Sequence, residues 1–276
     1  MREFLEYLFV KSLLGAAAIL PESAIFAVSQ FLAKTLFRID KKRRSIAIDN
    51  LMRALHISED EARALALQNY IELSKTVAEI LFLYHNRFSF EAVDTSELEK
   101  LQSLQSPIIF ITAHIGNWEA LAQLLAQKGY PMGVVGREGN NKLIEERITR
   151  PFRERFGNSL IYKHKAAREL VKYLRNGQNV GLLLDQRAGQ QGIWVEFFSR
   201  KASTVPTAYI LQKRFQTPIV PVFLVRENDR LKLKVFDPME FIDDEATHTR
   251  RINEVYEKII RTYPTQWFWM HDRWRG

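Results

Sequence analysis

Cysteine is absent from this chain of 276 residues. Its absence excludes disulfide bonds, thiolate nucleophiles and zinc sites with thiolate ligands. The six histidines are scattered without the spacing of metal ligands, such as a His-Glu-x-x-His helix. A glycine-rich loop followed by Lys and Ser or Thr, which would bind phosphate groups, is also missing. We therefore expect neither a catalytic metal nor a bound cofactor.

The chain also lacks a continuous apolar run of the length that crosses a membrane, about 20 residues. Residues 4–20 are rich in Leu, Phe and Ala, but Glu6 and Lys11 interrupt the run. The acidic residues Glu3 and Glu6 are unlike the start of a secretory signal peptide, and no clean cleavage pattern follows. The sequence thus predicts no signal peptide at this end, and it leaves two possibilities for the segment, which either spans the membrane or lies on it.

Two apolar helical segments separated by Pro21 are expected in residues 1–40. The second segment, residues 24–37, is followed by four consecutive cations at 41–44. Apolar helices next to a cluster of cations are typical of an anchor that rests on anionic headgroups, where each nearby cation adds roughly 1 kcal/mol. The alternative is two ordinary core helices with a solvated run of charges. We expect residues 1–40 to form a membrane-associated region and residues 41–276 to form one domain.

The composition bounds the class of protein and its partners. A chain of this length with 46% hydrophobic residues can form one sizeable α/β domain. The formal net charge of +8 favours acidic partners, namely nucleic acid, anionic lipid or an acidic carrier protein. No nucleic-acid recognition motif is present, and the aromatic residues do not alternate with basic residues, so we expect no nucleic-acid partner.

Alternating strand and helix patterns predict an α/β fold with a mixed, partly parallel central sheet flanked by helices. Ser58 and Glu61 form a capping-box pattern at the start of a long helix. The expected helices are 58–84, 118–128, 141–156, 166–176, 204–215 and 245–262, and the expected strands are 107–113, 132–136, 179–184, 219–225 and 231–236.

The segment Ile-Thr-Ala-His-Ile-Gly-Asn-Trp-Glu, residues 111–119, is the most informative part of the chain. His114 is expected at the carboxyl end of a buried strand, where open α/β sheets place their sites. Gly116 permits a tight turn, and Asn117 can cap the following helix. Glu119 would lie in the first turn of that helix, within reach of the imidazole. This pattern predicts a general base, His114, oriented by Glu119, although an isolated histidine can also be purely structural.

Two more charged residues follow predicted strands. Arg137 is a candidate for contact with an oxyanion or a phosphate, and its alternative is a surface arginine paired with Glu138 or Glu145. Asp185 would reach the same edge of the sheet, where it could bind an acceptor sugar or brace a neighbouring arginine.

The motif around His114 resembles the His-x4-Asp/Glu signature of glycerolipid acyltransferases, and its form His-x-Gly-Asn-Trp-Glu resembles the lipid A (lauroyl or myristoyl) acyltransferases. Ser199 departs from this family's pattern, which has glycine at that turn. Further blocks similar to the family occur in the same order at residues 43–51, 134–137, 184–189, 195–198 and 264–274.

The resemblance implies an acyl transfer from an acyl-acyl carrier protein to a hydroxyl of a lipid A precursor of the Kdo-lipid IVA type. His114 and Glu119 would then be catalytic. It also implies work at the cytoplasmic face of the inner membrane of a Gram-negative bacterium. Because no Gly-x-Ser-x-Gly elbow is present, we expect the acceptor hydroxyl to attack directly. The expected substrate-binding residues are Asn117, Arg137, Asp185 and Gln186.

Two alternatives change the function. The same residues could acylate a glycerophospholipid, an ornithine lipid or a mannosylated lipid, with coenzyme A as the carrier of the donor. A non-catalytic basic protein that binds membranes or nucleic acid would not need His114.

Two sets of residues also have two possible interpretations. One set of cations could dock the carrier or form a solvated helix face, namely Lys163, Lys165, Arg168, Lys172 and Arg175. One set of aromatic residues could line an acyl groove or belong to the core, namely Trp194, Phe197, Phe198, Trp267, Trp269 and Trp274.

Overall fold

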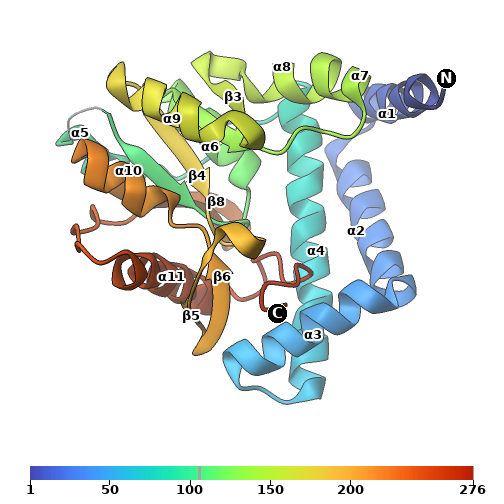
Figure 1. The fold of residues 1–276 in the computed structure, drawn as a ribbon. Helices are drawn as coiled ribbons and strands as arrows, with labels where there is room; N and C mark the ends of the chain where they lie inside the picture. Colours follow the sequence, from blue (N-terminus) through green and yellow to red (C-terminus); the bar gives the residue numbers. More distant parts are fainter. Residues whose placement is uncertain (105–106, 276) are drawn as a thin grey trace.

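The computed structural model describes residues 1–104 and 107–275. A six-stranded sheet in the order β3-β2-β4-β1-β7-β8 forms its centre (Figure 1). The strands from β3 to β7 in this order are parallel, and β8 pairs antiparallel with β7. The predicted single α/β domain with a mixed, partly parallel sheet is therefore confirmed. The strands are β1 (Ile109–Thr112), β2 (Met132–Gly136), β3 (Ser159–Tyr162), β4 (Asn179–Leu183), β7 (Ile219–Glu227) and β8 (Arg230–Val235).

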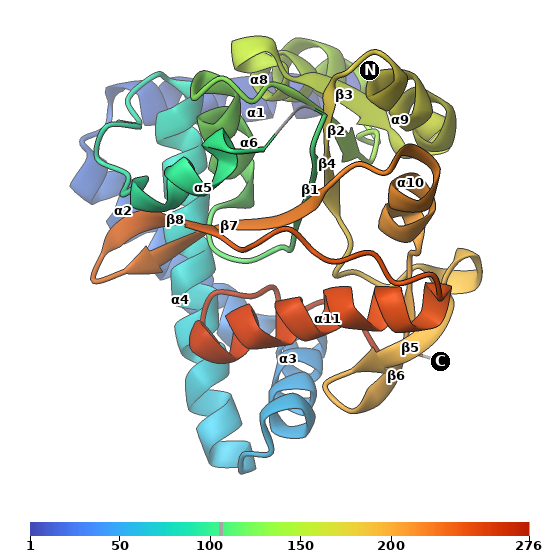
Figure 2. The same ribbon diagram turned by 90° about the vertical axis from the view of Figure 1, so that its left-hand side faces the viewer.

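Helices cover both faces of the sheet (Figures 1 and 2). Ile109 and Ile111 of β1 belong to one core cluster with α9, α10 and α11, whereas Ile108 and Phe110 belong to a second cluster with α6. Burial on both faces explains why the segment that contains β1 is a continuous apolar run. These helices are α6 (Trp118–Gln127), α9 (Ala166–Arg175), α10 (Thr207–Phe215) and α11 (Glu245–Thr262), and a short helix α5 (Glu99–Gln102) precedes β1.

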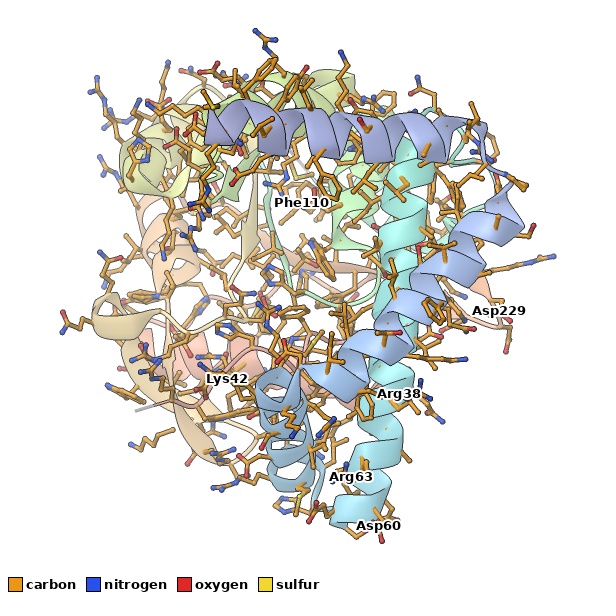
Figure 3. The ribbon with its side chains drawn as sticks, turned by 90° about the vertical axis from the view of Figure 1, so that its right-hand side faces the viewer. Arg38, Lys42, Asp60, Arg63, Phe110 and Asp229 are labelled. Carbon is orange, nitrogen blue, oxygen red and sulfur yellow. The ribbon has the colours of Figure 1, made fainter. Side chains whose placement is uncertain are left out.

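Four consecutive helices build the N-terminal part of the molecule (Figure 3). The predicted capping box at Ser58 is confirmed, because its side chain accepts from the backbone of Glu61 while the Glu61 carboxylate accepts from Ser58. Within the described residues, no helix is long and apolar enough to cross a membrane. The four helices are α1 (Arg2–Ile19), α2 (Glu22–Ile39), α3 (Lys41–Leu55) and α4 (Glu59–Tyr84).

The single helix expected over residues 141–156 is wrong, because this segment is broken. Pro151 has no backbone N–H for the usual hydrogen bond to the residue four positions earlier. The turn before it widens into a π-helix, and Phe156 adopts a positive φ of 58° that ends the segment. The segment consists of α7 (Lys142–Ile144), a π-helix (Glu145–Thr149), α8 (Arg150–Arg153) and a 3-10 turn (Arg155–Gly157).

The hairpin of β5 (Ile193–Phe197) and β6 (Arg200–Thr204) forms a separate two-stranded sheet. Its turn residues Phe198 and Ser199 both have a positive φ, 52° and 56°. Two left-handed residues match the right-handed twist of a tight hairpin. Ser199 thus adopts the conformation for which glycine is better suited.

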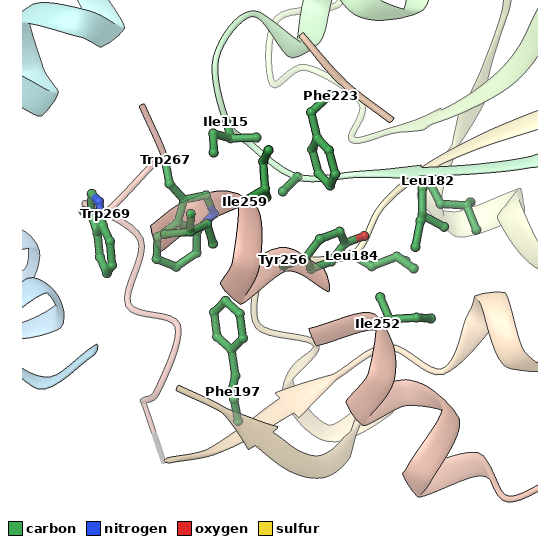
Figure 4. Packing of buried hydrophobic residues seen from close by; sticks show 14 of the residues in the cluster. Ile115, Leu182, Leu184, Phe197, Phe223, Ile252, Tyr256, Ile259, Trp267 and Trp269 are labelled. Atoms are coloured by element: carbon green, nitrogen blue, oxygen red, sulfur yellow. The ribbon is translucent and has the colours of Figure 1, made fainter. Parts of the chain in front are cut away.

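Aromatic residues of this hairpin pack against the C-terminal segment (Figure 4). Phe197 and Phe198 are buried, as are Trp267 and Trp269, whose ring centroids lie 4.7 Å apart. These four residues therefore belong to the core, whereas Trp194 is half exposed. Their packing places the C-terminal segment beside the ends of β1 and β4.

Candidate active site

A tight turn after β1 presents His114 at the carboxyl edge of the sheet. Gly116 in this turn has a φ of +59°, and an added Cβ would lie 2.0 Å from the carbonyl oxygen of Leu224. The backbone N–H of Asn117 donates to that same carbonyl over 2.8 Å. Any side chain at position 116 would therefore collide with β7, which is why this turn requires glycine.

Asp185 holds the imidazole of His114 in place. His114 Nδ1 lies 2.8 Å from Oδ1 of Asp185, and the backbone N–H of His114 donates to Oδ2 over 3.0 Å. The indole N–H of Trp267 also donates to Oδ2, over 2.8 Å. Asp185 follows β4, the parallel neighbour of β1, so the sheet itself brings the two residues together.

The environment of this pair suits a general base. Asp185 is 1% exposed, whereas the side chain of His114 is 24% exposed. No residue in the described part of the chain hydrogen-bonds Nε2 of His114, so this nitrogen is free for a substrate proton. With Nδ1 donating to Asp185, Nε2 is the acceptor in the neutral ring.

Burial and neighbouring charge shift the pKa of His114 in opposite directions, and they also shift the pKa of Asp185 in opposite directions. Burial disfavours the charged imidazole, but the charge and hydrogen bond of Asp185 outweigh it and raise the pKa of His114. Burial likewise favours a neutral Asp185, but the charge of His114 and the hydrogen bonds of His114 and Trp267 outweigh it and lower the pKa of this carboxyl. The carboxylate is thus ready to stabilise an imidazolium.

The expectation that Glu119 orients His114 requires a correction. Glu119 forms an ion pair with Arg153 through two hydrogen bonds, one of them 3.0 Å long from Nε to Oε2. Glu119 forms no hydrogen bond with His114 in the described part of the chain, and Asp185 takes the hydrogen-bonding position at Nδ1. The charge of Glu119 still contributes to the raised pKa of His114.

Arg153 is a site residue that the sequence did not indicate. Its side chain is 28% exposed, and Nη1 lies 3.4 Å from the position that a Cβ would take on Gly136, the last residue of β2. The broken segment after β2 delivers it, and neither the break nor its pairing follows from residue spacing. A fixed cation beside the base can stabilise negative charge in a reacting group.

Asn117 has a structural place, in contrast to the expected substrate contact. It is fully buried, and its Oδ1 caps α6 by accepting from the backbone of Ala120 over 2.9 Å. Its Nδ2 donates to Glu79, which also receives two hydrogen bonds from Arg226. Because Asn117 is fully buried and both ends of its amide already have partners within the protein, the structure gives it a structural role.

Arg137 and Gln186 lie at the same edge of the sheet as His114. Arg137 follows β2 and is exposed, and its guanidinium donates to Asn140 over 3.5 Å, so neither Glu138 nor Glu145 is its hydrogen-bonding partner. Gln186 directly follows Asp185 and is partly exposed. Substrate binding by these two residues stays a prediction.

Residues 264–275, which we call the C-terminal strap, pass beside both His114 and Asp185. The backbone N–H of Phe268 donates to the carbonyl of His114, and the backbone N–H of Gly116 donates to that of Gln266. The ring of His271 accepts from the backbone N–H of Arg187 over 3.0 Å, which requires an unprotonated Nε2. The strap therefore holds the turn after β1 and the loop after β4 in one arrangement.

Buried asparagines tie the strap to the N-terminal helices. Asn50 of α3 donates to the carbonyls of Trp269 and His271, and Asn69 of α4 donates to those of Thr265 and Trp267. Helices at the start of the chain thereby support a site near its middle through the strap at its end. Among the residues that the structure describes, no group of three His, Asp or Glu side chains could hold a metal ion.

Comparison with known proteins identifies the family. The model of the bacterial lipid A biosynthesis acyltransferases matches residues 1–276. Lipid A biosynthesis acyltransferase 2 of Shigella flexneri is 22% identical over 95% of this chain and 87% of its own length. The lipid A biosynthesis lauroyltransferase of Escherichia coli is 24% identical over 93% of this chain and 87% of its own length. The lipid A biosynthesis myristoyltransferase of that organism is 26% identical over 63% of this chain and 55% of its own length. This chain belongs to the bacterial lipid A biosynthesis acyltransferase family.

Proposed function

We propose that this chain transfers a fatty acyl group from an acyl-acyl carrier protein to a hydroxyl of a lipid A precursor of the Kdo-lipid IVA type. Family membership supports acyl transfer in lipid A biosynthesis. The observation that carries the mechanism is the hydrogen-bonded pair of His114 and buried Asp185, with Nε2 of His114 open to a substrate.

In the proposed reaction, Nε2 of His114 takes the proton of the acceptor hydroxyl while its oxygen attacks the thioester carbonyl. The tetrahedral intermediate then collapses, its C–S bond breaks, and the leaving thiolate takes the proton back from His114. Asp185 stabilises the imidazolium between the two steps, as the aspartate of a hydrolase triad does. The products are an ester and a free thiol, so protons and electrons balance.

Positive groups are proposed to stabilise the negative charge of the intermediate and of the substrates. Arg153, fixed by Glu119, is the candidate for charge that develops near the thioester. Arg137 is exposed at the end of β2 and is the candidate for an acceptor phosphate, with Gln186 as a neighbouring polar contact.

The acyl chain needs an apolar surface close to the base. The ring of Trp118 lies edge-on to that of His114, with centroids 5.3 Å apart. Val77 is 54% exposed and follows Thr76, whose hydroxyl donates to the carbonyl of Gly116. We propose that Trp118 and Val77 contact the acyl chain near the thioester.

We propose that residues 1–40 hold the enzyme on the anionic cytoplasmic face of the inner membrane. Large apolar side chains of α1 and α2 are exposed, including Phe9 at 65% and Phe31 at 68%. Arg38 and Lys42 lie at the junction of α2 and α3 (Figure 3), where the apolar helix α2 ends. Amphipathic helices that carry cations beside apolar residues bind to membrane surfaces without crossing them.

The test is acyl transfer from a radiolabelled acyl-acyl carrier protein to a tetra-acylated, Kdo-bearing lipid A precursor, with the intact chain and with His114→Ala. We expect product from the intact chain and a rate lower by about 10²–10⁴-fold in the variant, the usual contribution of a general base. If the intact chain acylates a glycerophospholipid, an ornithine lipid or a mannosylated lipid in place of this precursor, the proposed acceptor is wrong. Undiminished transfer by a folded His114→Ala variant would overturn the mechanism.

A further inference from the structure

Five cations gather at the end of β3 and along α9. We name Lys163, Lys165, Arg168, Lys172 and Arg175 the α9 cation stripe. All five are exposed, and none forms an ion pair with an acidic residue in the described ranges. Arg168, Lys172 and Arg175 follow helical spacing, so they share one face of α9, whereas Leu170 and Leu174 are buried against the sheet.

The stripe begins at the same edge of the sheet as His114. Lys163 and Lys165 lie in the 3-10 turn that directly follows β3. Three steps in the strand order β3-β2-β4-β1 separate this turn from the strand that delivers His114. At about 4.8 Å a step, the two sites are about 14 Å apart across the sheet. The helix then leads away from this edge toward Arg175.

From this placement we infer that the α9 cation stripe docks the acidic carrier protein that brings the acyl thioester to His114. The inference rests on the proposed function. A carrier seated on α9 would hold its thioester arm beside the edge where β4 and β1 end. Complementary charge steers such an encounter and fixes its orientation.

A membrane is the competing partner for a basic surface, and the structure favours the carrier. Large exposed apolar side chains are found on α1 and α2, whereas α9 contributes none among the described residues. Figures 1 and 2 place α9 and α2 on opposite sides of the sheet. A membrane bound to the apolar face of α2 would leave the stripe free for a protein from solution.

The test reverses three charges of the stripe, Lys165→Glu, Arg168→Glu and Lys172→Glu, in the full chain. The matched control reverses Lys128, Lys201 and Arg230, which are exposed elsewhere and lack ion pairs in the structure as described. Both variants change the net charge equally. Fluorescence anisotropy measures the Kd of labelled lauroyl-acyl carrier protein. We expect a Kd raised about tenfold or more in the stripe variant and changed less than about twofold in the control.

A second donor separates docking from chemistry. Lauroyl-pantetheine has the same thioester but no carrier, so the stripe variant should use it at the wild-type rate while its KM for lauroyl-acyl carrier protein rises. Equal losses of the acyl-transfer rate with both donors would overturn the inference. Equal Kd values for the stripe variant and the control would also overturn it. Loss of binding to anionic vesicles with an unchanged carrier Kd would also overturn it and assign the stripe to the membrane. An intact chain that binds the carrier through the stripe but transfers nothing would support docking and refute the proposed reaction.

Discussion

At the level of single residues, the roles of the two carboxylates near His114 follow from their neighbours. Asp185 follows β4, the strand beside β1, and its buried carboxylate accepts hydrogen bonds from His114 and Trp267. Glu119 begins α6 and is paired with Arg153. The first arrangement fixes one tautomer of the imidazole, and the second holds a cation near it.

The indole of Trp267 gives a direct test of this arrangement. Trp267→Phe removes one of the donors to Asp185 but keeps most of the buried ring. A hydrogen bond to a charged group contributes about 1.5–3 kcal/mol, so we expect kcat to fall at least about tenfold with little change in KM. Steady-state kinetics on the folded variant measure this split.

Trp269→Phe is the matched control, because its indole is equally buried but donates to the carbonyl of Pro264. Its kcat should stay near that of the wild type. Equal losses of kcat in the two variants would show that Trp267 acts through packing alone.

Asn117 should affect stability more than substrate binding. Asn117→Ala removes the cap of α6 and leaves the buried carboxylate of Glu79 with one donor fewer. Loss of a cap costs about 0.5–2 kcal/mol, and the buried Glu79 carboxylate also loses a donor, so the free energy of unfolding should fall by at least about 1 kcal/mol. Denaturant unfolding measures it, with Asn176→Ala, an exposed asparagine, as the control. A rise in the KM for the acceptor without loss of stability would restore the substrate-binding role.

At the level of elements, α1 and α2 expose apolar residues that a water-soluble surface rarely gathers in one place. Burial of a phenylalanine side chain is worth about 1.5–3 kcal/mol. The double variant Phe9→Glu, Phe31→Glu should therefore weaken binding to anionic vesicles by more than about tenfold and leave folding intact, because both rings are exposed. Vesicle sedimentation measures the effect.

The control for this element is Trp194→Glu with Ile210→Glu, on β5 and α10. Trp194 and Ile210 are also exposed, at 50% and 51%, compared with 65% and 68% for the two phenylalanines. If both double variants bind vesicles as the wild type does, residues 1–40 are not the membrane-contacting surface.

At the level of the whole molecule, distant parts of the chain complete one site. Asp185 lies 71 residues after His114, and the strap lies near the end of the chain. The buried ion pair of Arg226 and Glu79 links β7 to α4 directly behind Asn117. The turn that carries His114 is thus supported from β7, α4 and the strap together.

Local patterns could be predicted from the sequence, and contacts between distant segments could not. The apolar run before His114, the glycine turn and the capping box at Ser58 depend on neighbouring residues, and each is found. The pairing of Glu119 with Arg153 depends on a π-helix that no periodicity indicates. The short strand β3 is not predicted from the sequence, because four residues at a sheet edge give too little alternation of apolar and polar residues to recognise.

For Asp185, the position at the sheet edge could be predicted from the sequence, but the contact with His114 could not. The sequence placed it at the correct edge of the sheet, because strand ends can be predicted from apolar runs. The order of the strands, which puts β4 directly beside β1, decides that it meets His114. Strand order is set by long-range packing and not by the residues within each strand.

The measurement that tests the central claim most directly is the pH dependence of kcat/KM for acyl transfer in the wild type, Asp185→Asn and Glu119→Gln. His114 must be neutral to accept a proton, and its pKa is raised, so activity should rise with pH through a value above the ordinary histidine pKa of about 6.5. Asp185→Asn should move this acid limb to lower pH and lower the plateau by about 10²–10⁴-fold, whereas Glu119→Gln should move the limb less. An acid limb that shifts with Glu119→Gln but not with Asp185→Asn would contradict the account and make Glu119 the partner of His114.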